Sequence, residues 1–163
     1  MLRAKKTSVW KTGYQLSADG HPIAIWERSM WKEGGTFELD GQRYSVRSNM
    51  WGNKYGMTSE DGTPVAAADR LGRKRWTVEA AGRTYEFQRA SPWRPEEELR
   101  FAGERVGSIK RTSVWRSDAT ADLPGLPLPV QIFVFVVVLT RWDRSGAAAA
   151  AAGGGAGAAG ASG

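Results

Sequence analysis

The sequence predicts a mainly β protein: a closed antiparallel barrel of about ten to twelve strands, built from repeated hairpins around a C-terminal apolar helix. Three observations predict this fold class. Glycine-containing turns recur at a nearly constant spacing, apolar and polar residues alternate on both sides of each turn, and a long apolar segment follows the last repeat. The first two are typical of hairpins with one buried face, and the third is typical of a helix enclosed in a core.

The turns define the repeated unit. They are Asp19-Gly20, Asp40-Gly41, Asp61-Gly62, Ala81-Gly82 and Ala102-Gly103, at spacings of 21, 21, 20 and 21 residues. Asp-Gly between alternating stretches is a strong hairpin signal, because glycine tolerates the positive φ that a tight turn requires. The chain therefore reads as successive hairpins of about 21 residues.

Alternating apolar residues flank every turn, which is the pattern of a strand with one buried face. Around the first turn they are Tyr14, Leu16, Ile23 and Ile25. The later turns have corresponding sets, which are Phe37, Leu39, Tyr44 and Val46; Tyr55, Met57, Val65 and Ala67; Trp76, Val78, Tyr85 and Phe87; and Leu99, Phe101 and Val106. We expect these side chains to face the core.

A second repeat supports the same unit. The sequence Lys-Thr-Ser-Val-Trp-Lys at 6–11 returns as Arg-Thr-Ser-Val-Trp-Arg at 111–116, an offset of 105 residues. A sixth unit then begins near Thr112 and turns at Pro124-Gly125, and residues 126–141 replace its second strand. Five or six hairpins are too few for a propeller, whose blades take four strands each. Closure into a barrel removes the edges that an open sheet of this size would expose.

The apolar segment at 126–141 is expected to be a helix in the middle of the barrel. Its barrel-filling residues are Val130, Ile132, Phe133, Val134, Phe135, Val136, Val137, Val138 and Leu139. A helix that is apolar all round belongs in a core or in a membrane. Sixteen residues span roughly 24 Å as a helix, which is shorter than the ~30 Å hydrocarbon core of a bilayer. A membrane span and a valine-rich strand are the alternatives, and in either helical case Arg141, Trp142 and Arg144 would cap the helix.

These features resemble the tubby-like C-terminal fold, which tubby proteins, phospholipid scramblases and LURP-one-related proteins share. The resemblance rests on repeated hairpins followed by Asp-Leu-Pro-Gly-Leu-Pro-Leu-Pro-Val at 122–130 and an apolar helix. The segments Phe-Glu-Leu-Asp-Gly at 37–41 and Trp-Thr-Val-Glu-Ala-Ala-Gly at 76–82 are similar in style to the scramblase and LURP-one members, and the chain looks like a bacterial-type member. The resemblance covers about residues 5–142. It implies a barrel of about twelve strands threaded by the helix, and association with lipid or phosphoinositide.

The chain departs from the animal scramblases in several respects. It has no cysteine for palmitoylation and no proline-rich leader, and only Asp118 and Asp122 stand near the place of their acidic calcium segment. Two carboxylates are too few for a calcium site of six to eight oxygens, so we do not expect scrambling. Residues 1–144 are expected to form the domain. Residues 145–163, which are nearly all Ala and Gly, are expected to be a disordered tail.

The formal net charge of +6 favours polyanionic partners. The basic groups expected to bind anionic lipid are Arg73, Lys74 and Arg75 and, near the N-terminus, Lys5, Lys6 and Lys11. Trp76 beside the first group either lies at a headgroup boundary or, by its strand alternation, faces the core. We expect a cytoplasmic module, peripheral at the membrane, that binds anionic phospholipid or a membrane-bound protein. The alternatives are a single-pass, C-terminally anchored membrane protein and a nucleic-acid-binding barrel.

No motif in the sequence indicates an enzyme. Cysteine is absent, which excludes a disulfide framework, a thiolate metal site and a cysteine nucleophile. His21 is the single histidine and follows a turn without a partner motif for a triad or a metal. The glutamates at 96–98 are expected to be a solvated strand face or the first turn of a short helix. We therefore expect no catalytic residues, no metal and no cofactor.

Overall fold

A computed structural model describes residues 1–7, 13–29, 33–113 and 118–161, with side chains described as far as Gly146. These residues form twelve strands and one helix. The strands are β1 (Leu2–Lys6), β2 (Gly13–Ala18), β3 (His21–Arg28), β4 (Gly34–Leu39), β5 (Gln42–Ser48), β6 (Tyr55–Ser59), β7 (Pro64–Asp69), β8 (Arg75–Ala80), β9 (Arg83–Arg89), β10 (Glu96–Phe101), β11 (Glu104–Ser113) and β12 (Asp118–Asp122). The helix is α1 (Leu128–Ala161).

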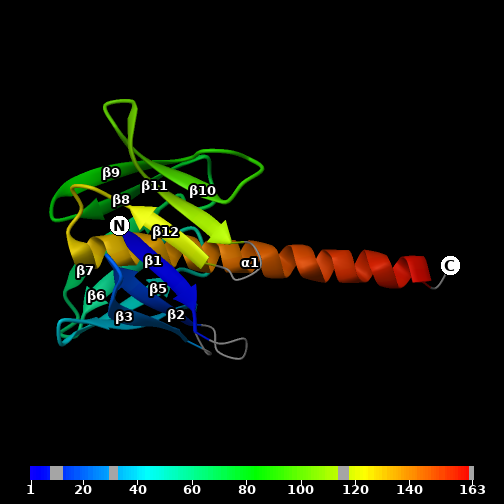
Figure 1. Cartoon of the computed structure of the whole chain (residues 1–163), viewed down its shortest axis with the longest axis horizontal. Coiled ribbons are helices and arrows are strands. Elements are labelled where there is room, and N and C mark those ends of the chain that lie inside the picture. The colour runs from blue at the N-terminus through cyan, green and yellow to red at the C-terminus, as the bar shows by residue number, and fades with distance from the viewer. Residues whose placement is uncertain (8–12, 30–32, 114–117, 162–163) are drawn as a thin grey trace.

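The described strands close into one antiparallel barrel (Figure 1). Each strand pairs with its neighbours in sequence, and the ring is completed where β1 pairs with β12. At that seam Leu2 lies opposite Ala121 and Ala4 lies opposite Ala119. Every described strand has a partner on both sides, with β3 and β4 joined only at Glu27–Thr36 and Arg28–Gly35, so the fold class predicted from the turn spacing is confirmed.

Successive strands run in opposite directions, so the barrel has two different ends. We call one the turn end, because β2, β4, β6, β8 and β10 finish there in short turns; the N-terminus is held there by a hydrogen bond from the Asp19 N–H to the Met1 carbonyl. We call the other the mouth, and its three fully described loops are residues 49–54, 70–74 and 90–95. The helix α1 enters at the turn end and leaves at the mouth (Figure 1).

The first part of α1 fills the barrel. Every side chain from Ile132 to Leu139 is at most 2% exposed, and Val130 is 3% exposed. The strands contribute the other large buried side chains, which include Trp26, Phe37, Met57, Trp76, Phe87 and Ile109. A helix that is apolar on every side is stable in such a site because all of its surface leaves water. The predicted central helix is confirmed, and the segment weighed as a membrane span or a strand lies inside the barrel as a helix.

The helix differs from the predicted one at both ends. It begins at Leu128, with Pro129 in the first turn where no N–H is required. It continues to Ala161, well past the strands, where the sequence predicts a disordered tail (Figure 1). Alanine, which fills positions 147–152, has the highest helix propensity, and a helix already nucleated inside the barrel gains one hydrogen bond per added residue. The propensity argument does not extend to the glycines at 153–155, 157 and 160. Within the described residues, no helix is both long and apolar enough to cross a membrane.

Four of the five predicted glycine turns have one geometry. Asp19, Asp40, Ala81 and Ala102 have φ angles of 49°, 51°, 51° and 50°, and a glycine with positive φ follows each. Positive φ at both central residues is the type I′ geometry, whose twist matches that of the flanking strands. The turn at Asp61 is longer, and its Oδ1 accepts a hydrogen bond from the Thr63 N–H at 3.0 Å.

Bulges in three hairpins reverse part of the predicted strand faces. The extra residues in the register are Ile23, Val65 and Val106. Side chains alternate with a period of two, so one extra residue moves the following positions to the opposite face. The expectation that Ile25, Ala67 and Val106 face the core is therefore wrong: Ile25 is 54% exposed and its neighbour Trp26 is buried instead. Phe101, also expected inside, is exposed at the tip of its hairpin.

Candidate functional site at the mouth of the barrel

The predicted basic cluster lies at the mouth. Arg73 and Lys74 belong to loop 70–74, Arg75 opens β8, and all three side chains are exposed. Leu71 in the same loop is buried, and its N–H donates to the Asn53 carbonyl at 3.0 Å. The loop is thus held to the barrel while its basic side chains face outward. Within the described chain no ion pair joins these three residues to a carboxylate.

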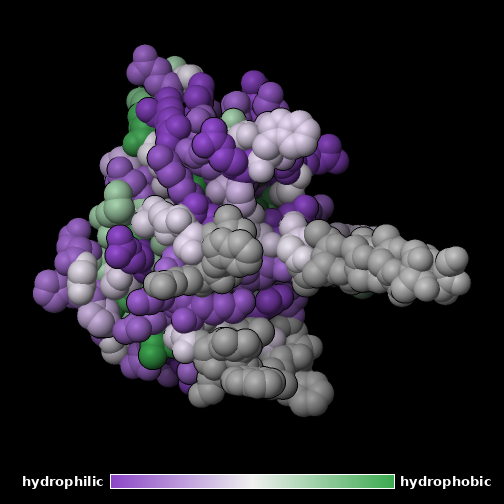
Figure 2. Space-filling model, turned by 45° about the vertical axis from the view of Figure 1, so that its right-hand side comes forward, coloured by the Kyte–Doolittle hydropathy of each residue, from purple (hydrophilic) through white to green (hydrophobic). Residues whose placement is uncertain are grey.

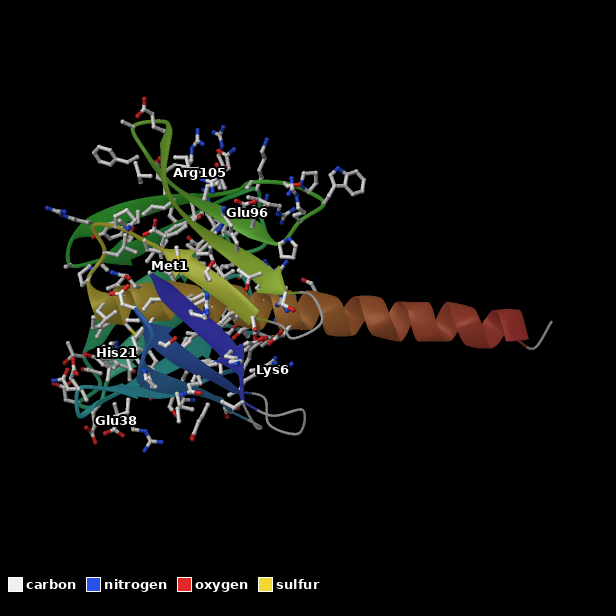
Figure 3. All side chains as sticks on the ribbon, viewed as in Figure 1. Met1, Lys6, His21, Glu38, Glu96 and Arg105 are labelled. Atoms are coloured by element: carbon white, nitrogen blue, oxygen red, sulfur yellow. The ribbon has the colours of Figure 1, made fainter. Side chains whose placement is uncertain are left out.

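The N-terminal lysines do not join this cluster. Lys5 and Lys6 are exposed on β1, and Lys6 lies at the end of the barrel from which α1 leaves (Figure 3). The strand order places β1 opposite β7 across the ring, so Lys5 and Lys6 share the mouth with loop 70–74 but lie on its far side. Lys11 lies outside the described residues. The five predicted lipid-binding residues that the structure describes therefore do not form one patch.

The two ends of the barrel carry opposite excess charge over the described residues. The mouth is mainly basic, with Lys5, Lys6, Arg28, Arg47, Lys54, Arg70, Arg73, Lys74, Arg75, Arg89, Arg94, Lys110, Arg111, Arg141 and Arg144 against Glu27, Glu33, Asp69, Glu96, Glu97, Asp118 and Asp143. The turn end is mainly acidic, with Asp19, Glu38, Asp40, Glu60, Asp61, Glu79, Glu104 and Asp122 against Arg43, Arg83, Arg100 and Arg105. Figure 3 shows His21 and Glu38 at this second end, away from Lys6. The mouth therefore attracts anions and the turn end repels them.

Exposed aromatic side chains also gather at the mouth. Trp93 in loop 90–95 is 90% exposed, and Met50 and Trp51 in loop 49–54 are 88% and 79% exposed. Figure 2 shows an otherwise largely hydrophilic surface with small, separate hydrophobic patches. Sequence reasoning missed these residues. A usable signal was present, because both tryptophans stand among turn-forming residues where no strand face can bury them.

Trp76 does not belong to the exposed group. It is 1% exposed, and its ring stacks on Phe87 with centroids 4.4 Å apart. Its Nε1–H donates to Glu97 Oε2 at 3.1 Å. The interpretation of Trp76 as a headgroup-boundary residue is therefore wrong, and the inward alternation of its strand is confirmed. Glu97, expected on a solvated face, lies half-buried against the indole.

A polar network fixes α1 where it leaves the barrel. The Tyr14 hydroxyl donates to the carboxylate of Asp143, with both oxygens at 3.0 Å. Arg111 lies 3.5 Å from Asp143 Oδ1, and its guanidinium lies over the Trp142 ring, 5.4 Å from the centroid. Burial and then the Asp143 charge raise the pKa of the Tyr14 hydroxyl well above its usual range. The hydroxyl therefore stays protonated and donates at physiological pH.

Two arginines of α1 lie over glycines of the mouth loops. A side chain at Gly52 would collide with the guanidinium of Arg144, and one at Gly72 would collide with that of Arg141. Both glycines also have positive φ, of 69° and 90°. Arg144 pairs with Glu33 at 2.6 Å. The basic residues of α1 therefore lie at the mouth as expected, but the helix continues past them to Ala161, so they do not cap it.

A cavity of about 310 Å³ opens beside α1 at the mouth; we call it the mouth pocket. Its lining residues come from loops 70–74 and 90–95, from the neighbouring strands and from α1, and they are Leu71, Gly72, Arg89, Ser91, Pro92, Trp93, Arg94, Pro95, Glu96, Glu97, Val138, Arg141, Trp142 and Ser145. Arg89 is fixed by a hydrogen bond from its Nη2 to the Gly72 carbonyl at 2.9 Å. Burial raises the pKa of the Glu97 carboxyl, while the Trp76 hydrogen bond and the charges of Arg89 and Arg141 lower it in part.

The described residues contain no group of three His, Cys, Asp or Glu side chains placed to hold a metal ion. His21 is exposed at the turn end, where its Nδ1 lies 3.1 Å from the Asp19 carbonyl oxygen. It is therefore remote from the mouth pocket.

Comparisons of the chain with protein-family models, with curated proteins and with solved structures gave no match. The architecture is consistent with the tubby-like fold, since a closed barrel of twelve described strands surrounds one C-terminal helix. Membership of that family stays a prediction from the sequence motifs.

Proposed function

We propose that the protein is a non-enzymatic binding module that docks on anionic phospholipid surfaces through the mouth of its barrel. The observation that carries the proposal is the exposed basic cluster of Arg73, Lys74 and Arg75, which no described carboxylate pairs, at the same end as exposed Trp51 and Trp93. Basic residues attract anionic headgroups, and tryptophan favours the membrane interface. The lipid association that the family resemblance implies points in the same direction.

The contact is expected on one side of the mouth. Loops 49–54, 70–74 and 90–95 connect successive pairs of neighbouring strands from β5 to β10, so they form one continuous arc. The helix α1 projects from the middle of the same end, and its sequence after Arg144 contains no charged residue. A membrane that meets the arc therefore has to accommodate the projecting helix next to it, and that part of the helix adds no charge of its own.

The proposal is tested by Arg73→Ser, Lys74→Ser and Arg75→Ser in one variant, with co-sedimentation on vesicles of phosphatidylcholine and phosphatidylglycerol. Each basic residue near an anionic surface contributes about 1 kcal/mol, so the triple change should weaken binding by about two orders of magnitude. The matched control removes the same charge elsewhere, with Arg3→Ser, Arg43→Ser and Arg83→Ser, all exposed and away from the arc.

Equal losses in the two triple variants would mean that only net charge matters, and the mouth would not be the docking face. Unchanged binding in the first variant would move the contact to Lys5, Lys6 and Lys11. A parallel titration with single-stranded and duplex oligonucleotides tests the other class of polyanion. Binding to oligonucleotides without binding to vesicles would replace this proposal with a nucleic-acid-binding barrel.

A further inference from the structure

The mouth pocket presents both signs of charge to one cavity. Arg89 from β9, Arg141 from α1 and Glu97 from β10 all line it. Among the described residues neither arginine forms an ion pair with a carboxylate. The positive charges of both nevertheless lower the pKa of the Glu97 carboxyl in part. Glu96 at the rim is already paired, with Arg105 at 3.0 Å and Lys110 at 3.9 Å. A complementary ligand therefore carries an anionic and a cationic group.

The cationic group belongs at Glu97. One carboxylate oxygen, Oε2, accepts the Trp76 hydrogen bond, and the structure gives Oε1 no hydrogen-bond donor among the described residues. A half-buried carboxylate is costly without compensation, and a protonated amine supplies both charge and N–H donors. A quaternary ammonium has no N–H group and could not donate to Oε1, whereas a primary ammonium can. The site thus favours a primary ammonium.

The anionic group belongs at the two arginines. A guanidinium matches the paired oxygens of a phosphate or a carboxylate, and two of them favour the more highly charged phosphate. Arg89 is pre-oriented by its bond to the Gly72 carbonyl, and Arg141 by its close packing over the same glycine. The cavity of about 310 Å³ is at the lower end of the range for small-molecule sites. It accommodates a headgroup-sized molecule.

We infer that the mouth pocket binds a small phosphate ester bearing a primary ammonium, with the phosphate on Arg89 and Arg141 and the ammonium on Glu97. A phospholipid headgroup and a free soluble ester share this chemistry. In a lipid the ammonium is the far tip of the headgroup, so it would enter first and reach half-buried Glu97, while the phosphate stays nearer the rim beside exposed Trp93. Only the lipid source rests on the proposed membrane docking; binding of the soluble ester does not.

Isothermal titration of the full chain with phosphoethanolamine, glycerol 3-phosphate and ethanolamine tests the inference. Phosphoethanolamine should bind at least tenfold more tightly than either of the others, because each of those carries only one of the two groups. Glu97→Gln keeps an oxygen acceptor for the Trp76 N–H but removes the charge. It should reduce phosphoethanolamine affinity by about tenfold and leave glycerol 3-phosphate affinity unchanged or higher. Glu79→Gln, an exposed carboxylate at the turn end, is the charge-matched control.

An equal affinity of the wild-type protein for phosphoethanolamine and glycerol 3-phosphate would overturn the inference, as would equal losses in the two Glu variants. Vesicles with a fixed phosphatidylglycerol fraction, with and without phosphatidylethanolamine, distinguish the two sources. Enhancement by phosphatidylethanolamine that Glu97→Gln abolishes identifies a lipid headgroup. Soluble binding without that enhancement identifies a free ester. In the latter case the pocket inference stands even if the variant lacking Arg73, Lys74 and Arg75 shows that membrane docking fails.

Discussion

The two ends of the barrel are made by the same repeated hairpins, yet they differ in every property that matters for binding. The turn end has short turns and mainly acidic charges. The mouth has longer loops, mainly basic charges, exposed Trp51 and Trp93, and a cavity beside α1. A two-residue type I′ turn leaves little freedom of sequence, whereas a longer loop on a rigid scaffold can vary without disturbing the sheet. The comparison teaches that the regular end specifies the fold and the irregular end is available for function.

The largest effect is expected from a substitution in the barrel core, because unfolding of the barrel destroys the mouth and the turn end together. Val136 lies in the middle of the buried part of α1 and is fully inaccessible. Val136→Asp places an unpaired carboxylate in the barrel core, which costs several kcal/mol, about as much as a whole domain is stable by. We expect an insoluble or molten protein, judged by near-UV circular dichroism and thermal melting.

The matched control is Ile25→Asp, on the outer face of β3, where the residue is 54% exposed. Its stability should change by about 0.5 kcal/mol at most. A chain ended after Asp122, which lacks α1, should fail as Val136→Asp does, because the barrel would surround a void. A soluble truncated chain with a cooperative melt would show that the hairpins need no central helix.

A smaller effect is expected for the exposed aromatic residues. Trp93→Ala and Trp51→Ala should each weaken binding to anionic vesicles by roughly tenfold, because an aromatic side chain at the interface contributes about 1.5 kcal/mol. Neither should lower the melting temperature, since both side chains are exposed. Phe101→Ala removes a 74% exposed aromatic residue from a hairpin tip at the turn end. If Phe101→Ala weakens co-sedimentation with vesicles as much as Trp93→Ala does, the exposed aromatic residues of the two ends contribute equally, and the mouth is not the preferred docking face.

The next prediction concerns how the stability of the folded protein changes with pH through the carboxyl group of Glu97. Burial raises the folded-state pKa of Glu97, so its stabilising contribution is complete below the unfolded value of 4.5 and is lost as the pH rises through the folded value. Above the folded value the ionised carboxylate therefore reduces stability, an effect that is present at neutral pH to the extent that Glu97 is ionised. Glu97→Gln should melt at or above the wild-type temperature there, and the difference should shrink toward about pH 4. Thermal melts across this range check it; a lower melting temperature of the variant at neutral pH contradicts it.

The smallest effect is expected from deletion of residues 145–163. The helix beyond Arg144 projects from the mouth and does not line the barrel (Figure 1). Its sequence lacks large side chains, so it has little apolar area to bury on the domain. Calorimetry should place the melting temperature of the shortened chain within about two degrees of the full chain. A drop of many degrees would mean that the projecting helix stabilises the mouth.

The fold could be predicted from the sequence because its signals are local. A glycine turn and the alternation beside it lie within one hairpin, and a fixed repeat of about 21 residues left a barrel as the natural closure. The predicted strand faces were wrong at or after the bulges at Ile23, Val65 and Val106, and at Phe101 in a hairpin tip. Nothing in the sequence marks which residue of a hairpin lies outside the register. The helix α1 extends past Arg141 through a segment of alanine followed by glycine-rich sequence, and this composition carries no periodic signal that marks where a helix ends.

The site could be predicted only in its local part. Arg73, Lys74 and Arg75 are consecutive, so the sequence alone places them together, and their binding of anionic lipid stays a prediction. The mouth pocket brings together Arg89 and Arg141, which are distant in sequence and meet only because α1 passes through the closed barrel. Whether Lys5 and Lys6 lie near or far from loop 70–74 likewise depends on the ring order of the strands. These spatial relations arise only when the strands close into a barrel, so no short stretch of the sequence indicates them.

The central claim is that the mouth, and not the turn end, faces an anionic membrane. The chain has no cysteine, so a single introduced cysteine carries a fluorescent label without background. Met50→Cys in loop 49–54 and Glu60→Cys at the turn end are both at exposed positions. On addition of anionic vesicles, the label at position 50 should shift to the blue and become protected from an aqueous quencher, while the label at position 60 should stay unchanged. Protection of the label at 60 with none at 50 would contradict the account.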